Sequence, residues 1–364
     1  MNGQNRIVTT CQHDKIPGVF ESSVRKPQVN ASIVSPSVPG AVEADRTSNE
    51  TPNKTNNHCP WSQHIDSWRQ LAGSEIGRRS YVPLPNDCID ELDNALAQGF
   101  SADNNRDELL YSLPACAALV AMLRTELLSG NGFVVLDRLP VKRYDINQNR
   151  QLAGLIGSML SPLLEQDRHG TILYDVLDKG SAEVALRRSK TNQAQPFHTD
   201  GAWLQPSPAL IGLFCIQPAM SGGSSQLASL PMAIARLAEQ DEAFDIAALH
   251  QAMFWNKMGE HKAGDQPYSH LPALDSQTGC FRYYVNYVET GYALAGQQFP
   301  DVLRKMFHLI DQALAATAIK PFALQAGQLQ YVNNQWLVHA RAEFTDLEVA
   351  ERGRHLVRIW NRRP

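Results

Sequence analysis

The sequence predicts an α+β protein with a mainly β core, a β-sandwich or jelly roll with two helices on one outer face. Short apolar stretches separated by turns dominate from His198 onward, which is typical of such folds. These stretches do not alternate regularly with helices, which disfavours a parallel α/β fold. Neither G-x-G-x-x-G nor G-x-x-x-x-G-K occurs, so the nucleotide-binding loops that carry those motifs are not expected.

Apolar periodicity places the elements. Helical spacing predicts helices at residues 113–130, ending in Ser-Gly, and 147–164, broken near Pro162. Each is followed by a strand-like run, at 132–139 and 171–178. In the second half we expect strands at 209–216, 281–288, 327–334, 336–344 and 354–360, and helices at 231–240 and 299–317.

The composition changes near residue 57. Residues 1–57 are rich in Ser, Pro, Asn and Thr and show no periodic apolar face, so we expect a disordered polar arm. Residues 58–364 are expected to form one domain that begins with helices. With 43% hydrophobic and 19% charged residues, the 364-residue chain can bury a sizeable core.

Charge and cysteine usage limit the function classes. The net charge of −4 and the lack of a Lys/Arg cluster argue against a nucleic-acid partner. The longest apolar run, near residues 209–216, is too short to span a bilayer, so no membrane association is expected. The six cysteines form no C-x-x-C pair, which favours a reduced, cytoplasmic setting. The oligomeric state cannot be predicted.

The sequence contains two H-x-D pairs, His198/Asp200 and His64/Asp66. Such pairs arise easily by chance among 11 His and 37 acidic residues. The first pair lies at the edge of an expected strand, where residues i and i+2 face the same way and can converge on one cation. His64 lies at the start of an expected helix, where i and i+2 diverge by about 200°. We therefore expect His198 and Asp200, rather than His64 and Asp66, to bind a metal.

A third ligand would complete a facial triad of two histidines and one carboxylate, which leaves three positions of Fe(II) open. His339 is favoured because it lies in a strand-like run with a polar entrance. The other candidates are His250, His261, His270, His308 and His355.

Two arginines in the last predicted strand suggest anion binding. Arg354 and Arg358 are four residues apart, so both face the same way in a strand. A buried unpaired guanidinium is costly, and its fork suits a carboxylate. The alternative, that they are surface cations of the C-terminal tail, fits Arg362 and Arg363 better.

Taken together, "FHTD…GGSS…VHARAEF…RHLVRIW" resembles the TauD/TfdA family of Fe(II)- and 2-oxoglutarate-dependent oxygenases over about Gly132 to Trp360. The resemblance implies a double-stranded β-helix (jelly roll) with flanking helices. It implies metal ligation by His198, Asp200 and His339, and binding of the distal carboxylate of 2-oxoglutarate by Ser225 and Arg354. It also implies that Arg358 contacts an acidic group of the primary substrate. Ala340 stands where many relatives have Gly.

The implied activity is that of a 2-oxoglutarate-dependent dioxygenase using Fe(II), 2-oxoglutarate and O2. It would hydroxylate or desaturate a small anionic, amino-acid-like substrate, free or carrier-bound, for example in specialised-metabolite biosynthesis. Asp200 argues against halogenation, which needs that ligand position vacated. Residues 283–287 and Asn333/Asn334 could add hydrogen bonds, although core packing is as good an interpretation of the tyrosines. The alternatives are a cupin-type, non-oxidative metalloenzyme holding zinc or manganese, and a binding protein with a vestigial site.

Overall fold

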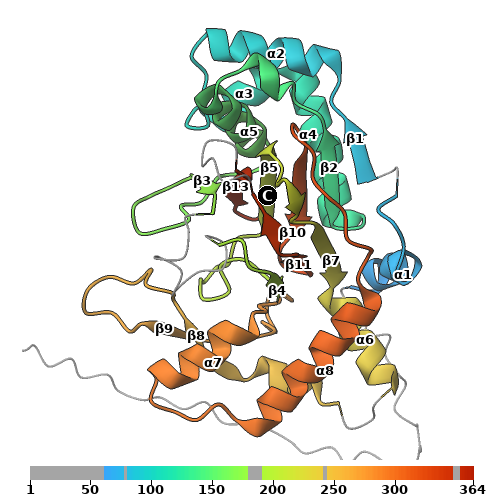
Figure 1. Cartoon of the computed structure of the whole chain (residues 1–364), viewed down its shortest axis with the longest axis vertical. Helices are drawn as coiled ribbons and strands as arrows, with labels where there is room; N and C mark the ends of the chain where they lie inside the picture. The colour runs from blue at the N-terminus through green and yellow to red at the C-terminus, as the bar shows by residue number, and fades with distance from the viewer. Residues whose placement is uncertain (1–60, 78–79, 179–190, 241–243, 347–352) are drawn as a thin grey trace, which may run out of the picture. The chain divides into compact units, whose positions relative to one another are not determined.

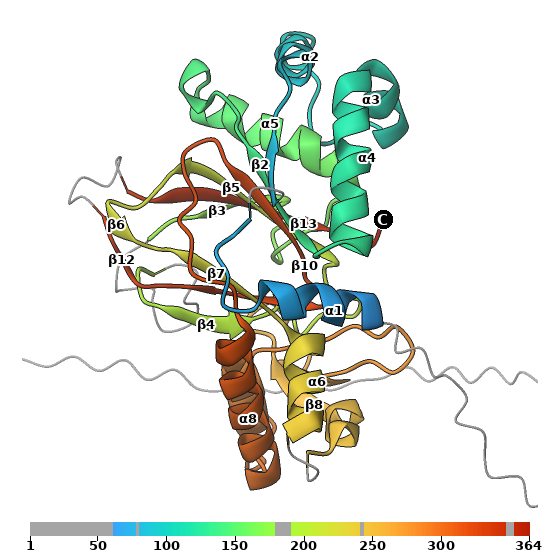
Figure 2. The ribbon, with the colours of Figure 1, turned by 90° about the vertical axis from the view of Figure 1, so that its right-hand side faces the viewer.

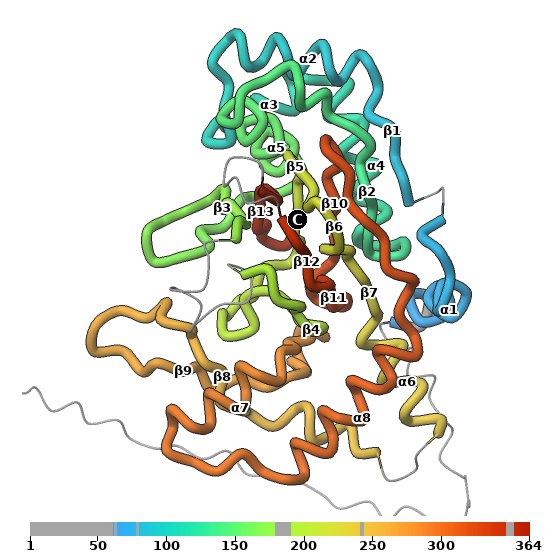
Figure 3. The backbone as a smooth tube through the Cα atoms, in the orientation of Figure 1, coloured from blue at the N-terminus to red at the C-terminus, as the bar shows by residue number. Residues whose placement is uncertain are grey.

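The computed structural model describes residues 61–77, 80–178, 191–240, 244–346 and 353–364, so the predicted polar arm lies outside the described residues. A six-stranded sheet organises this part of the chain, in the order β1-β2-β10-β5-β13-β3. Its strands are β1 (Tyr81–Pro83), β2 (Phe133–Asp137), β3 (Leu173–Val176), β5 (Leu210–Gln217), β10 (Leu329–Asn333) and β13 (His355–Asn361). Strands far apart in sequence, such as β2 and β10, therefore run side by side (Figure 3).

A smaller sheet faces the six-stranded one, in the order β4-β11-β7. It contains β4 (Gln195–His198), β7 (Ser225–Ser229) and β11 (Leu337–Arg341). The short pair β6 (Ser221–Gly222) and β12 (Phe344–Thr345) extends beside it, and β8 (Ala252–Asn256) pairs with β9 (Tyr268–Pro272). Figure 2 shows the two sheets as stacked layers. The predicted jelly roll with a mainly β core is thereby confirmed.

Helices cover the outer face of the large sheet, above it in Figures 1 and 2. They are α2 (Asn86–Ala97), α3 (Arg106–Ser112), α4 (Pro114–Ser129) and α5 (Ile146–Leu160). Helix α4 begins with Pro114, whose fixed φ suits the first turn, and α5 begins with a capping box of Asp145 and Gln148. Strand β5 is buried over most of its length because these helices cover one face and the small sheet lies over the other.

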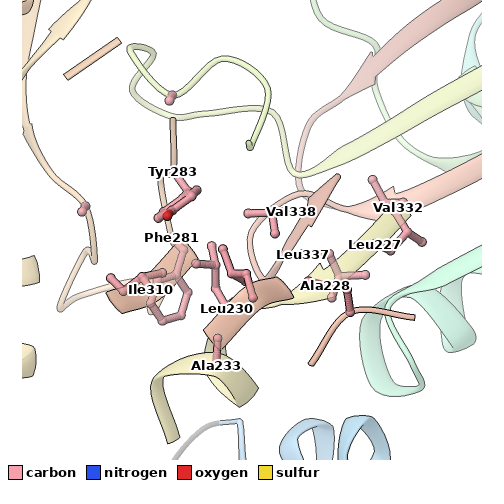
Figure 4. Packing of buried hydrophobic residues seen from close by; sticks show 14 of the residues in the cluster. Leu227, Ala228, Leu230, Ala233, Phe281, Tyr283, Ile310, Val332, Leu337 and Val338 are labelled. Atoms are coloured by element: carbon pink, nitrogen blue, oxygen red, sulfur yellow. The ribbon is translucent and has the colours of Figure 1, made fainter. Parts of the chain in front are cut away.

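The remaining helices pack beyond the small sheet. They are α1 (Ser62–Leu71), α6 (Leu230–Gln240), α7 (Val285–Leu294) and α8 (Asp301–Thr317). Figure 4 shows Leu227 and Ala228 of β7 and Leu337 and Val338 of β11 gathered with Ile310 of α8. The small sheet is thus packed into one hydrophobic cluster, which fixes the backbone on which the candidate site is built.

Most predicted elements are present, within a few residues of their expected ends. The strand predicted at 281–288 is wrong: Phe281 makes one isolated bridge, and helix α7 begins at Val285. Its tyrosines and valines favour a strand, but tertiary packing outweighs that preference. In the described residues no single helix is long and apolar enough to cross a membrane; α3 and α4, bent by 118°, meet the length and composition criteria only as a pair.

Candidate metal centre and active site

Three side chains suited to metal binding meet where β4 and β11 pair. His198, the last residue of β4, lies in register with His339 in the middle of β11. Asp200 lies in the turn that follows β4, and its Oδ1 is 3.5 Å from Nε2 of His198 and 3.9 Å from Nε2 of His339. All three are buried, and their possible ligand atoms lie within 4.8 Å of one another. The structure therefore brings together the three residues that the sequence singles out.

The second carboxylate oxygen of Asp200 is held by the protein. Trp360 donates its indole N–H to Oδ2 at 2.9 Å, and Nη1 of Arg358 lies 3.3 Å from the same oxygen. Burial alone would raise the pKa of Asp200, but Arg358 and the two histidines outweigh burial and lower it. The carboxylate is thus ionised, with Oδ1 turned toward the histidines.

The backbone that carries Asp200 is fixed by Asn334. The Asn334 side chain accepts the Asp200 N–H at 2.8 Å and donates to the carbonyls of Asp200 and Pro208 at 3.0 and 2.8 Å. Asn334 therefore supports the metal centre from behind and does not line the pocket. Asn333 likewise bonds to the carbonyl of Leu127, at 3.1 Å. The substrate contacts suggested for these two asparagines are not supported.

His198 is oriented by its own strand. Its Nδ1 lies 2.9 Å from the carbonyl of Pro196, which can only accept, so Nδ1 carries the proton and Nε2 keeps a free lone pair. The side-chain amide of Gln195 donates to that lone pair at 2.9 Å. Nδ1 of His339 has no hydrogen-bond partner among the described residues, and burial lowers the pKa of His339 to about 3. A neutral His339 can therefore act as a ligand.

A pocket opens beside the three residues and is also lined by Ser225, Arg354 and Arg358. Leu356 lines it too, so alternate residues of the last strand face inward as predicted. Arg354 is only 7% exposed, and no carboxylate lies within 4 Å of it in the described part of the chain. Burial lowers the pKa of Arg354, as expected of a desolvated cation.

The Gly-Gly pair explains how Ser225 reaches this pocket. Gly222 and Gly223 have φ values of +75° and +65°, which side chains rarely adopt. A Cβ on Gly222 would lie 2.3 Å from the carbonyl oxygen of Glu343, and one on Gly223 would lie 3.5 Å from Nε of Arg354. The turn therefore needs glycine, and it delivers Ser225 to the first position of β7, opposite Arg341.

Arg341 is a third buried cation of this pocket, and the sequence reasoning missed it. Its guanidinium and that of Arg354 lie over the Phe344 ring, 4.8 and 5.2 Å from the centroid. Burial, and then Arg354, lower the pKa of Arg341 to about 10. It donates to the carbonyls of Thr191 and Gln193, the latter through a very short contact. Arg341 therefore ties the segment that leads into β4 to β11.

A second pocket adjoins His198 and Asp200 and also shares Gln195 and Arg358 with the first. Tyr284, Tyr287 and Trp203 line it. The Tyr284 ring packs 4.9 Å from His198. Tyr283, by contrast, donates its hydroxyl to Asp311 at 2.6 Å and belongs to the core. Core packing is therefore the interpretation that fits Tyr283, whereas Tyr284 and Tyr287 lie at the pocket.

Arg358 occupies the boundary between the two pockets. Besides its contact with Asp200, it donates from Nε to Oε1 of Gln166 at 2.8 Å, and Gln166 donates back to the Arg358 carbonyl at 2.7 Å. Its guanidinium also lies 5.0 Å from the Tyr174 ring centroid and 4.9 Å from that of Trp360. Arg358 therefore has a carboxylate partner within the protein, Asp200. This ion pair is the alternative to a contact with a substrate carboxylate.

His64 lies apart from the metal centre, as the helical position predicted. It is buried in α1 and bonds to Ser229 Oγ at 3.0 Å, whereas Asp66 is exposed. Burial lowers the pKa of His64 to about 4. His64 and Asp66 therefore do not point toward a common metal position. Among the described residues, no other group of His, Cys, Asp and Glu forms a candidate metal cluster.

A jelly roll that brings two histidines and one carboxylate together defines the class of mononuclear non-heme iron oxygenases. The family described as "Taurine catabolism dioxygenase TauD, TfdA family" matches residues 93–360, so the chain belongs to that family. The predicted enzyme class, a 2-oxoglutarate-dependent dioxygenase that uses Fe(II) and O2, is confirmed by this membership. The two alternatives, a non-oxidative metalloenzyme and a vestigial binding protein, are correspondingly disfavoured.

Individual relatives are distant. The FR-33289 synthase of Streptomyces rubellomurinus (strain ATCC 31215) is 25% identical over 269 residues, covering 70% of this chain and 76% of that protein. An asparagine oxygenase, solved with Fe(II), (2S,3S)-3-hydroxyasparagine and succinate, is 17% identical with a TM-score of 0.61. It covers 78% of this chain and 93% of its own. The non-heme iron oxygenase OrfP, solved with Fe, succinate and (3S)-hydroxy-L-Arg, is 16% identical with a TM-score of 0.56, covering 78% and 94%.

Proposed function

We propose that this enzyme hydroxylates or desaturates a small anionic, amino-acid-like substrate, either free or attached to a carrier. His198, Asp200 and His339 hold Fe(II), Arg354 and Ser225 bind the distal carboxylate of 2-oxoglutarate, and Arg358 faces an acidic group of the substrate. The observation that carries the proposal is the position of Arg358, a buried cation at the wall shared by two pockets that both adjoin His198 and Asp200.

The chemistry of the first pocket fits 2-oxoglutarate. Arg354 is buried without a carboxylate partner among the described residues, and a guanidinium in that state favours an anionic ligand. Ser225 supplies a hydroxyl at the same pocket wall. The donor set of two imidazoles and one carboxylate suits Fe(II). A single pocket thus offers a metal centre at one end and a carboxylate anchor at the other.

The second pocket fits a small organic acid. Tyr284, Tyr287 and Trp203 give it aromatic walls, and Arg358 provides its cation. The names of the similar solved structures place asparagine and arginine derivatives in related oxygenases, which agrees with an amino-acid-like substrate here. The Arg358–Asp200 contact at 3.3 Å is the competing interpretation, in which Arg358 only orients the metal carboxylate.

Bound Fe(II) and 2-oxoglutarate supply the O2-activating oxidation. The chain's own residues contribute positioning and exclusion of water. Trp360 and Arg358 keep Oδ2 of Asp200 occupied so that Oδ1 faces the metal position. Pro196 accepts the Nδ1 proton of His198, which makes Nε2 the ligand atom once its hydrogen bond from Gln195 is broken. We place the enzyme in the cytoplasm, because its cysteines form no disulfide or zinc pattern in the sequence.

Anaerobic addition of Fe(II) and 2-oxoglutarate tests the cofactor assignment. A visible metal-to-ligand charge-transfer band should form in the wild type and be lost in His198→Ala, Asp200→Ala and His339→Ala. His64→Ala, the matched histidine outside the site, should keep the band. Comparable Fe(II) affinity in the wild type and His339→Ala would overturn the triad.

The substrate assignment is tested with Arg358→Ala in a screen of amino acids and related small acids. The variant should bind Fe(II) and 2-oxoglutarate and still release succinate slowly, but should lose product formation coupled to it. Exposed Arg304→Ala is the control and should behave as the wild type. A lower melting temperature with coupling intact would show that Arg358 acts only through Asp200.

A further inference from the structure

A second cluster of arginines lies away from the metal centre. Arg282, Arg362 and Arg363 line a pocket of about 440 Å³. This pocket shares no lining residue with either pocket that adjoins His198 and Asp200. We call it the arginine pocket. It is therefore a separate feature of the surface and needs its own explanation.

Arg282 is the unusual member of this group because it is only 3% exposed. Its Nη1 donates to the carbonyl of Pro272 at 3.3 Å, and its Nε has no hydrogen-bond partner in the described part of the chain. Burial lowers the pKa of Arg282, which agrees with a cation removed from water. A desolvated guanidinium whose Nε lacks a hydrogen-bond partner is costly, and an anion in the pocket would offset that cost.

Asp275, the acidic side chain that lines the pocket, attracts Arg282 but forms no ion pair within 4 Å of it among the described residues. Its Oδ1 accepts the backbone N–H groups of Gln277 and Thr278 at 3.0 and 3.1 Å, so that oxygen is engaged in its own turn. No ion pair within 4 Å forms at Arg282, Arg362 or Arg363 among the described residues. Three arginines against one aspartate leave the lining with two excess positive charges, which suits a dianion.

The remaining lining indicates what kind of dianion fits. Ser207 and Gln335 add neutral hydrogen-bonding groups, and Leu164 and Pro206 add apolar surface. Guanidinium forks bind phosphate oxygens in pairs, and a phosphate offers more acceptor oxygens to several donors than a carboxylate does. The pocket is also far larger than one phosphate ion, so it has room for an organic body against the apolar wall.

We propose that the arginine pocket binds a small phosphorylated organic molecule, at a site distinct from the metal centre. Arg282 forms the buried end of the site, and Arg362 and Arg363, both exposed, approach the phosphate from the rim. Two of its residues are close in sequence to residues that support the metal centre: Arg362 follows Trp360 by two positions, and Gln335 follows Asn334. Its occupancy requires neither the oxygenase activity nor its cosubstrate.

The test is calorimetric titration of the full chain with phenyl phosphate under anaerobic conditions, with Fe(II) and saturating 2-oxoglutarate present so that Arg354 is already occupied. We expect binding that the double substitution Arg362→Ala/Arg363→Ala weakens at least about tenfold. Arg282→Met should weaken it similarly. Arg282 is buried, so Arg282→Met could misfold. The result for the exposed double variant therefore decides whether the site exists. Arg143→Ala, an exposed arginine on another face, is the control and should bind as the wild type.

Two comparison ligands sharpen the outcome. Inorganic phosphate should bind more weakly than phenyl phosphate, because it lacks the apolar body. Benzoate should also bind more weakly, because it carries one negative charge. Equal binding of benzoate would overturn the choice of phosphate, and equal binding of inorganic phosphate would overturn the organic body. Absence of phenyl phosphate binding, or binding that the double variant leaves unchanged, would overturn the site itself.

Discussion

Trp360 donates its indole N–H to Oδ2 of Asp200 at 2.9 Å, in a position buried from solvent. The bond occupies one oxygen of the carboxylate and leaves Oδ1 toward the two histidines. Partners of this kind orient metal ligands, and removing one typically lowers metal affinity by about 10- to 100-fold. We therefore expect Trp360→Phe, which keeps an aromatic ring and removes the donor, to weaken Fe(II) binding by about that factor.

The measurement is the Kd for Fe(II) under anaerobic conditions, with melting temperature recorded in parallel. Trp336→Phe is the matched control, because Trp336 packs against His64 rather than Asp200. An Fe(II) affinity in Trp360→Phe equal to that of the control would show that the indole only fills space.

Arg354 provides the second prediction. If it binds the distal carboxylate of 2-oxoglutarate, Arg354→Ala removes a desolvated charge pair and should raise the KM for 2-oxoglutarate by the equivalent of about 2–5 kcal/mol. Ser225→Ala removes a single hydrogen bond and should cost about 1 kcal/mol. Arg69→Ala, an exposed arginine paired with Glu239, is the control. An unchanged KM in Arg354→Ala would require another anchor, and Arg341 would be the first candidate.

Much of this arrangement is predictable from local sequence. The spacing of His198 and Asp200, and of Arg354 and Arg358, predicts that each pair faces the same way. Asp200 lies in the turn just after β4 and Arg354 just before β13, so the alternation of a strand is only approximate there. Helices α4 and α5 follow from apolar periodicity and their terminal signals. These features depend on neighbours in the chain, which a sequence displays directly.

The supporting residues depend on distant contacts and could not be predicted. Gln166 meets Arg358 across 192 positions, and Asn334 meets Asp200 across 134. Arg341 is recognised as a pocket residue only from its burial over Phe344. Its position two residues after His339, on the same face of the expected strand, could have indicated this from the sequence. Helix α7 was missed because Val285 and Tyr287 favour strands in isolation, whereas packing against β8 decides their conformation.

Gln195 provides a third prediction. Its amide donates to Nε2 of His198 at 2.9 Å, along the lone pair that a metal must use. Metal binding therefore has to break this hydrogen bond, worth about 1 kcal/mol. We expect Gln195→Leu to bind Fe(II) about fivefold more tightly than the wild type in the absence of 2-oxoglutarate. Exposed Gln193→Leu is the control. Weaker Fe(II) binding in Gln195→Leu would mean that the amide supports the metal instead of competing with it.

His64 makes stability depend on pH. Its pKa is lowered by burial from 6.5 to about 4, so between those values the unfolded chain binds a proton that the folded chain does not. The free energy of unfolding should therefore fall as the pH is lowered from 6.5 toward 4, by about 3 kcal/mol from this residue alone, and the contribution should be absent above pH 7.

Urea unfolding of wild type and His64→Gln at pH 7 and pH 4 measures this loss of stability. Glutamine keeps a polar group near Ser229 but does not titrate, so the variant should lose less stability on acidification. His308→Gln, at an exposed position of α8, should follow the wild type. Equal acid losses in wild type and His64→Gln would show that His64 is protonated without unfolding, and that its burial does not control the acid limit of the fold.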